Sequence, residues 1–365
     1  MASPVSGIIG ELLPTMRRGD FLGYQELFNR LYYEGRELSP GQLTEAIAEL
    51  APVLAVHPGG VFARLALVAG AYAEWGGSAQ ALAATTPAVA LEALRWRARF
   101  SELWPNVSGG RAEPSRDQAP SMDEVGDAFH AAAGRLGLSK ADAEVIALSW
   151  FDTPHWIKLM ITALCDREFR AVAGHRSEIA EAAARLGDDV PGAHWLPGLA
   201  RVLDDEPLIV IDRHGTHGFR LTMSGVGDNY QLHTLLADRV IGDPARGLVP
   251  GDRPEPSWVA AATTAEPQRP ADDLIKRRFR LFDGTGAYVY PEGVPADIAL
   301  TEGTRVIVLH PPRGNMMWVS GRTYNQMVPE LTLDQILSQE ETAAWHARVA
   351  PARETDLFGP PGSAR

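Results

Sequence analysis

The chain has 365 residues, of which 45% are hydrophobic and 22% are charged. This content is too apolar for a disordered chain, and the single cysteine excludes a disulfide scaffold. The sequence contains no run of about 18 apolar residues that would predict a membrane span. Lys and Arg number 34 against 46 Asp and Glu, and the net charge of −12 argues against general nucleic-acid binding. The length predicts two domains.

The first residues do not have the order of a secretory signal. The apolar stretch 8–13 is short and contains Glu11, and the charges of Arg17 and Arg18 follow it instead of preceding it. With one cysteine, this pattern predicts a cytoplasmic protein. Only three of the 34 basic residues are lysines, which together with abundant Gly and Pro is typical of a high-GC, actinobacterial genome.

Residues 1–205 predict a helical domain built of stacked αα-hairpins. Pro40, Pro58, Pro87 and Pro154 each open a run of helical periodicity, where the missing N–H of proline does no harm. The segment 105–121 is rich in Pro, Gly and Ser and predicts a loop or linker. The expected helices are 7–16, 22–34, 41–56, 60–75, 87–103, 122–136, 139–151, 154–174, 176–186 and 194–204.

Residues 206–350 predict a smaller mixed α/β domain, which makes the fold class α+β. Residues 351–365 predict a flexible tail. The expected elements are a hairpin of 208–211 with 218–223, a helix at 230–241, a short segment at 258–263, a hairpin of 277–282 with 287–290, a buried strand at 304–309, a strand at 316–320 and a final helix at 334–349.

The densest group of titratable residues lies in the turn of the first hairpin. His214 and His217 stand three residues apart beside Asp212, a pattern that suits a metal site or acid–base chemistry. A solvated hairpin turn, with Gly215 supplying a positive φ, explains the same residues and is the favoured interpretation.

A glycine segment precedes the helix expected at 230–241. Gly225, Gly227 and Asn229 would present backbone N–H groups at a helix N-terminus, where an anion such as a carboxylate or phosphate can bind. Tyr230 stands where a dinucleotide fingerprint has its third glycine. An ordinary turn with Asp228 or Asn229 as N-cap is therefore favoured.

Polar residues also follow the buried strand 304–309. If this strand and 208–211 end at the same edge of a sheet, Asp212, Arg213, His310 and Arg313 converge there. Arginines can bind a carboxylate and a histidine can move protons near neutral pH. The alternative is a proline-stiffened loop with solvated tips.

The remaining candidates have favoured structural explanations. The basic run 276–280 predicts an edge strand with Arg278 and Arg280 outward and Phe279 and Leu281 inward, and nucleic acid is the lesser alternative. Cys165 predicts a buried, non-catalytic thiol. Aromatic residues predict helix packing or an aromatic-lined groove for a peptide or apolar ligand, namely Trp150, Phe151, Trp156 and Trp195, with His155 beside them.

Two functions fit these features. The preferred one is an intracellular binding or scaffold protein that recognises a peptide, a partner protein or a small organic ligand. The alternative is an enzyme with a site between the two halves, in which His310, Arg313, His214 and Asp212 are the catalytic candidates. A metal-dependent protein is a third possibility, although no Cys pair or His-Glu-x-x-His motif is present. The sequence identifies no cofactor.

Overall fold

The computed structural model describes residues 4–18, 20–115, 119–264, 274–314 and 316–353. The chain divides into two compact units, residues 1–200 and 201–365. An ion pair of Arg201 with Asp297, and a hydrogen bond from Gly225 N to Leu203 O, attach residues 201–205 to the second unit. A helical part followed by a mixed part confirms the predicted α+β class.

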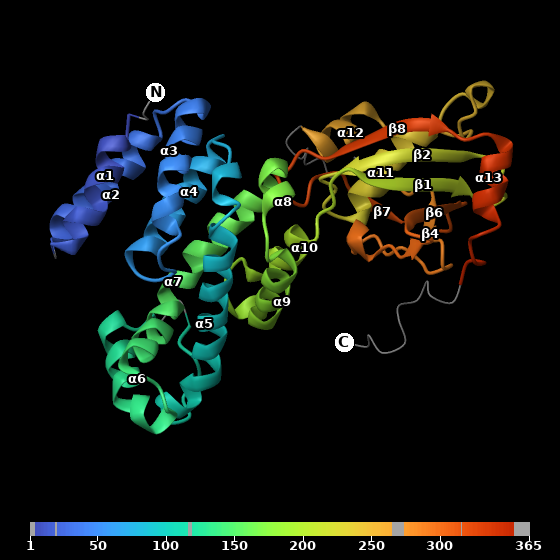
Figure 1. The fold of residues 1–365 in the computed structure, drawn as a ribbon. Coiled ribbons are helices and arrows are strands. Elements are labelled where there is room, and N and C mark those ends of the chain that lie inside the picture. The colour runs from blue at the N-terminus through green and yellow to red at the C-terminus, as the bar shows by residue number, and fades with distance from the viewer. Residues whose placement is uncertain (1–3, 19, 116–118, 265–273, 315, 354–365) are drawn as a thin grey trace. The chain divides into compact units, whose positions relative to one another are not determined.

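All regular elements among the described residues of the first unit are helices, as Figure 1 shows. Among these residues no helix has the length and apolar character needed to cross a membrane. The helices are α1 (Ser6–Arg17), α2 (Phe21–Gly35), α3 (Pro40–Leu54), α4 (Val61–Glu74), α5 (Thr86–Val107), α6 (Met122–Leu136), α7 (Lys140–Cys165), α8 (Arg167–Val172), α9 (Arg176–Leu186) and α10 (Leu196–Ala200), with short turns η1 (Gln80–Leu82), η3 (Gly187–Asp189) and η4 (Ala193–Trp195).

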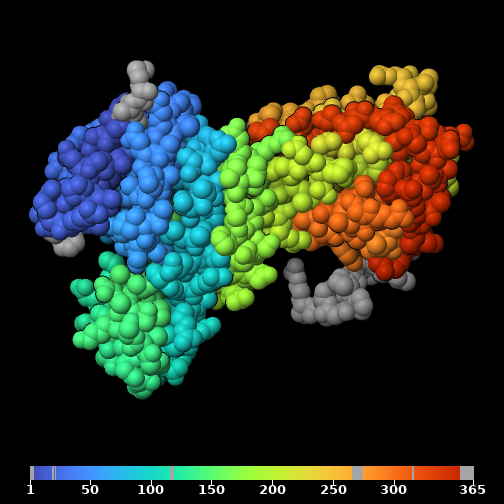
Figure 2. Space-filling model, viewed as in Figure 1, coloured from blue at the N-terminus to red at the C-terminus, as the bar shows by residue number. Residues whose placement is uncertain are grey.

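Consecutive helices pack in pairs, α1 with α2, α3 with α4, and α6 with α7. Helix α7 is the centre of the unit, because α4 and α5 also pack along it. The end of α5, α6 and the start of α7 share an apolar cluster that includes Phe100, Trp104 and Phe129. In the space-filling view these elements form a lobe at one end of the unit (Figure 2).

The prediction of a helix break at Pro154 was wrong. Helix α7 extends over 26 residues and includes Pro154, and Thr153 is fully buried within it. The Thr153 hydroxyl donates to the carbonyl of Ala93 in α5 at 3.0 Å. Tertiary packing against α4 and α5 thus holds one continuous helix across a proline that local preference alone would place at a helix start.

The second unit contains one main sheet and a separate two-stranded sheet. The main sheet has the order β4-β6-β1-β2-β8, with β5 also paired to β6, and only β1 and β6 run parallel. Figure 1 shows these five strands side by side in that order. The strands are β1 (Glu206–Asp212), β2 (Gly218–Ser224), β3 (Leu274–Lys276), β4 (Arg280–Asp283), β5 (Leu300–Thr301), β6 (Thr304–His310), β7 (Met317–Val319) and β8 (Glu330–Ile336), and β3 pairs with β7.

Helices cover both faces of the main sheet. On one face, side chains such as Val210 and Ile307 pack against α11 (Asn229–Val240) and α12 (Pro256–Thr263). On the other face, Ile211 and Val308 form a smaller cluster with Trp345 of α13 (Gln339–His346). The short turns η5 (Pro244–Arg246) and η6 (Pro295–Asp297) lie in the connections. The strand at 304–310 is buried on both faces, as its continuous apolar run predicts.

Two local predictions for this unit were wrong. The final helix does not begin near Asp334, because residues 330–336 pair with β2 as strand β8, and Ser338 caps α13 instead. Arg280, expected outward, is 4% exposed and donates to the carbonyl of Pro311 at 3.0 Å.

The second predicted hairpin forms over a short length. Residues 287–290 return antiparallel to β4, with backbone hydrogen bonds from Asp283 N to Ala287 O and from Val289 N to Leu281 O, both at 2.9 Å. They are joined to β4 by a single bridge and not as a strand, and β4 pairs mainly with β6.

Candidate functional site

The ends of β1 and β6 are neighbours, as the convergence hypothesis requires. The two strands are parallel with Asp212 opposite Leu309, and Arg213 N donates to Leu309 O at 3.0 Å. Both strands therefore end at one edge of the sheet, and the loops that carry His214 and Arg313 leave from that edge.

The side chains at these two strand ends nevertheless point to opposite faces. Asp212 follows Val210 in the pleat and belongs to the face that packs against α11. His310 follows Val308 on the face of α13, and its ring lies 4.6 Å from that of Phe282. The structure thus brings the backbones together but does not bring Asp212 and His310 together as an acid–base pair.

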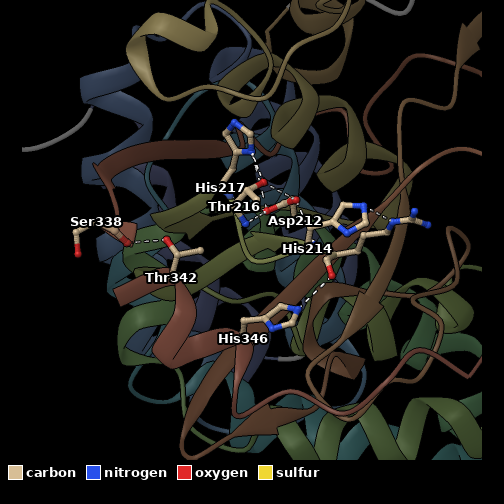
Figure 3. Close-up of polar contacts among 8 residues, drawn as sticks. Asp212, His214, Thr216, His217, Ser338, Thr342 and His346 are labelled. Atoms are coloured by element: carbon tan, nitrogen blue, oxygen red, sulfur yellow. Dashed lines mark hydrogen bonds and ion pairs between the residues drawn. The ribbon is translucent and has the colours of Figure 1, made fainter. Parts of the chain in front are cut away.

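Asp212 organises the hairpin turn. Its carboxylate accepts hydrogen bonds from the backbone N–H groups of His214, Thr216 and His217 at 3.2, 2.6 and 2.6 Å, and from the Thr216 hydroxyl at 2.9 Å. Partial burial alone would raise the pKa of Asp212, but these hydrogen bonds together lower it below its usual range. Figure 3 shows the carboxylate between His214 on one side and Thr216 with His217 on the other.

The histidines around this turn bind groups of the turn itself. His214 Nε2 accepts from Arg213 Nε at 2.9 Å, and His217 Nδ1 lies 3.0 Å from the Thr216 hydroxyl. His346 of α13, which sequence reasoning missed, contacts Arg213 O at 3.1 Å (Figure 3). Across the described residues, no group of three or more His, Cys, Asp or Glu side chains is placed to hold a metal ion.

Arg313 lies in the exposed loop after β6. Its carbonyl accepts a hydrogen bond from the guanidinium of Arg277, which also donates to Tyr288 Oη at 3.2 Å. Together with the hydrogen bond from Arg280 to Pro311 O, this contact holds the loop to the rest of the unit through its backbone carbonyls.

We expect Asp212→Ala to destabilise the second unit by about 1–3 kcal/mol, because three turn amides and one hydroxyl lose their shared acceptor. Hydrogen exchange of residues 206–224 is the measurement, since these amides belong to the hairpin that the turn closes. Asp212→Asn keeps one side-chain oxygen as an acceptor, so it should lose less stability than Asp212→Ala. Equal protection in the wild type and the alanine variant would contradict a structural role for Asp212.

The glycine segment before α11 does not offer free donors to an anion. Gly225 N donates to Leu203 O at 2.9 Å, Gly227 N to Gln231 Oε1 at 2.7 Å, and Asn229 N to Gly293 O at 2.9 Å. Asp228 is the N-cap and accepts from Gln231 N at 2.7 Å. These contacts support the ordinary turn with an N-cap that the sequence favoured over an anion site at Gly225, Gly227 and Asn229.

A cavity of about 380 Å³ opens beside the first turns of α11. Aromatic rings form part of its wall, with the centroids of Tyr230 and Trp318 5.2 Å apart. Thr323 donates to Asp228, whose pKa burial raises above its usual range. The lining residues come from α11 and from the segment around β7: Asp228, Tyr230, Gln231, Thr234, Trp318, Val319, Gly321, Arg322 and Thr323.

Behind this wall lies a buried histidine with one unused donor. His233 is 4% exposed, its ring centroid is 4.8 Å from that of Trp318, and its Nε2 accepts from the backbone N–H groups of Arg278 and Phe279 at 3.0 and 3.1 Å. Burial, together with the charges of Arg277 and Arg278, lowers the pKa of His233 to about 3. The ring is therefore neutral with its proton on Nδ1, and Nδ1 is buried without a hydrogen-bond partner among the residues that the structure describes.

Other buried polar atoms in the same region also lack partners within the described part of the chain. Such atoms are rare in native proteins, and each calls for an explanation such as a bound water or ligand. They are Asn229 Oδ1, Trp258 Nε1, Arg277 Nε, Arg278 Nε and Trp318 Nε1. Sequence reasoning treated 276–280 as a solvated edge and Trp318 as an ordinary strand residue, because no spacing rule links either segment to α11.

The aromatic residues singled out by the sequence in the first unit lie in different environments. Trp156 is fully buried, and its Nε1 donates to Pro58 O at 2.5 Å, whereas Trp195 is 42% exposed. Trp150 lines a second cavity of about 350 Å³, where the buried Arg97 forms an ion pair with Glu113. Core packing therefore accounts for Trp156, and Trp150 and Phe151 pack against the apolar cluster shared by α5, α6 and α7.

No protein-family model, curated protein or solved structure matches the chain.

Proposed function

We propose that the second unit is a binding module for a small planar organic molecule, which occupies the cavity lined by Tyr230, Trp318 and Arg322. Its volume of about 380 Å³ lies in the range of small-molecule sites. Two aromatic rings offer a stacking surface, and polar groups from α11 and the segment after β7 surround it.

The observation that carries the proposal is the composition of the cavity wall. The rings of Tyr230 and Trp318 lie 5.2 Å apart, and polar side chains such as Gln231, Thr234 and Arg322 make up much of the remaining lining. Small-molecule sites combine aromatic surface with a few polar groups in this way.

The geometry gives less support to the enzyme alternative. Asp212 is occupied by four hydrogen bonds within its own turn. His310 lies on the other face of the sheet beside Phe282. An acid–base pair needs side chains within hydrogen-bond reach of one reacting group, which these two are not placed to provide.

Indole-3-acetate and indole-3-acetamide are suitable probes, since both carry a planar ring that can stack on Trp318 and Tyr230. We expect the full chain to bind at least one of them with a Kd below about 1 mM by isothermal titration calorimetry. Trp318→Ala should weaken this binding about tenfold, because the loss of a stacked ring is worth about 1 kcal/mol or more.

Tyr230→Ala provides a second test, since Tyr230 is half-buried and its removal threatens the fold less. Trp345→Ala is the matched control, because this indole packs on the opposite face of the sheet. If neither probe binds, or if both cavity variants bind as tightly as the control, the proposal fails.

A further inference from the structure

We propose that the exposed face of the β3–β7 ribbon (Leu274–Lys276 paired with Met317–Val319) is a docking surface for an acidic peptide segment of a partner protein. Two observations support this: an apolar sheet face open to solvent, and a local excess of positive charge in a chain of net charge −12. The surface is distinct from the cavity, because Lys276 and Met317 do not line it.

One face of the ribbon packs against α11. Ile275 and Trp318 stand opposite each other in the two strands, and both are buried. The Trp318 ring lies 5.2 Å from that of Tyr230 and 4.8 Å from that of His233, both in α11. This contact holds the ribbon on the rest of the second unit.

The other face of the ribbon is open to solvent in the described part of the chain. Because side chains alternate along a strand, the neighbours of Ile275 and Trp318 point away from α11. Leu274 stands opposite Val319, and the exposed Lys276 stands opposite Met317. Met317 is 46% exposed and Val319 is 56% exposed. Apolar side chains and a lysine thus share one unpartnered face.

The charge around the ribbon is one-sided. The guanidinium of Arg277 donates to neutral acceptors, Tyr288 Oη at 3.2 Å and the carbonyl of Arg313, and no described carboxylate pairs with Lys276 or Arg278. The sequence segments 274–282 and 310–327, which contain the two strands, hold six basic residues and no acidic one: Lys276, Arg277, Arg278, Arg280, Arg313 and Arg322.

Acidic residues near these segments either make contacts elsewhere or lie outside the described residues. Asp283 is 5% exposed and accepts hydrogen bonds within its own turn. Asp228 caps α11, and Glu292 accepts from Tyr230 Oη at 2.7 Å, so both interact with the helix on which the buried face packs. The aspartates at 272–273 lie outside the described residues. The described residues of the two segments therefore give this surface a net positive charge.

An acidic peptide is complementary to both features of the surface. Its carboxylates pair with the basic residues, and this attraction brings such a segment to the ribbon although the whole chain is negative. In an extended peptide, side chains on one face are about 7 Å apart, which is also the spacing of Met317 and Val319 along β7. Apolar peptide residues can therefore contact both. A nucleic acid is less suited, because its phosphates meet a chain of net charge −12.

Fluorescence anisotropy of a labelled peptide tests this proposal on the full chain. The probe is a short peptide of alternating glutamate and valine, and its neutral counterpart has glutamine in place of every glutamate. We expect the acidic peptide to bind about tenfold more tightly than the neutral one, and added salt to weaken its binding. Lys276→Gln and Met317→Ser should each weaken it by about threefold, and neither threatens the fold because both side chains are exposed.

Matched control variants come from the first unit. Lys158→Gln removes the same charge at another exposed position, and Met122→Ser removes a methionine that is 44% exposed. Both controls should bind the acidic peptide like the wild type.

Four outcomes would overturn the proposal. The first is that the acidic peptide does not bind, and the second is that the neutral peptide binds as tightly. The third is that the control variants weaken binding as much as Lys276→Gln and Met317→Ser do. The fourth is that phosphatidylserine vesicles or a single-stranded oligothymidine bind more tightly than the acidic peptide and lose affinity in Lys276→Gln, which would assign the surface to a membrane or to nucleic acid.

Discussion

Replacement of Trp156 by alanine should destabilise the helical unit by about 4 kcal/mol. The side chain is fully buried in α7, so the substitution leaves a large cavity between packed helices. It also leaves the carbonyl of Pro58 without the indole N–H that donates to it at 2.5 Å. Urea unfolding followed by circular dichroism measures the loss, since this unit holds most of the helices.

Two further variants make this result specific. Trp156→Phe keeps an aromatic ring and loses the hydrogen bond, so we expect it to cost roughly half as much. Trp195→Ala removes an indole that is 42% exposed and should change stability by less than about 1 kcal/mol. Equal losses for Trp156→Ala and Trp195→Ala would show that burial in α7 is not the source of the effect.

Acid should destabilise the second unit through His233. The pKa of this histidine is lowered from 6.5 to about 3 in the folded chain. Between these values the unfolded chain binds a proton at His233 that the folded chain does not, so the free energy of unfolding decreases as the pH falls. Neutral His233 contributes its full stabilisation above pH 6.5. Below that pH, the free energy of unfolding falls by at most about 1.4 kcal/mol per pH unit through this residue.

His233→Gln isolates this contribution, because the amide oxygen can still accept from Arg278 N and Phe279 N but does not titrate. We expect the wild type to lose about 2–3 kcal/mol more than the variant between pH 7 and pH 4.5. Denaturant titrations at a series of pH values measure the free energy of unfolding of both proteins. Hydrogen exchange of the α11 amides at the same pH values is the second measurement. Parallel pH profiles for the two proteins would contradict the buried, neutral state of His233.

Local sequence patterns predicted many of the elements correctly, because these elements have strong local signals. Ser39 and Ser121 begin helices with capping boxes, and the apolar run before His310 is a buried strand. Predictions from local signals were wrong where contacts with a segment distant in the sequence determine the local structure. Pro154 lies inside α7 because α4 and α5 pack along it, and Asp334 lies in β8 because β2 pairs with it.

At the candidate site, too, local contacts were predictable and contacts between distant segments were not. Asp212 and His214 form a turn, as their composition favours, because the contacts involved lie within five residues. The parallel alignment of β1 and β6 was a hypothesis from the sequence, but the pleat that separates Asp212 from His310 depends on their register. The cavity beside α11 was not predicted, since Tyr230 and Trp318 are 88 positions apart and no local pattern links the two segments.

The sequence by itself determined the α+β class, the order of a helical part before a mixed part, and most helix starts, because helix periodicity, capping and apolar runs act between near neighbours. Only the tertiary structure decided which polar groups are buried without partners. Whether the Nδ1–H of His233 or the Nε–H of Arg278 has an acceptor depends on atoms from distant segments, and no local sequence pattern encodes their positions.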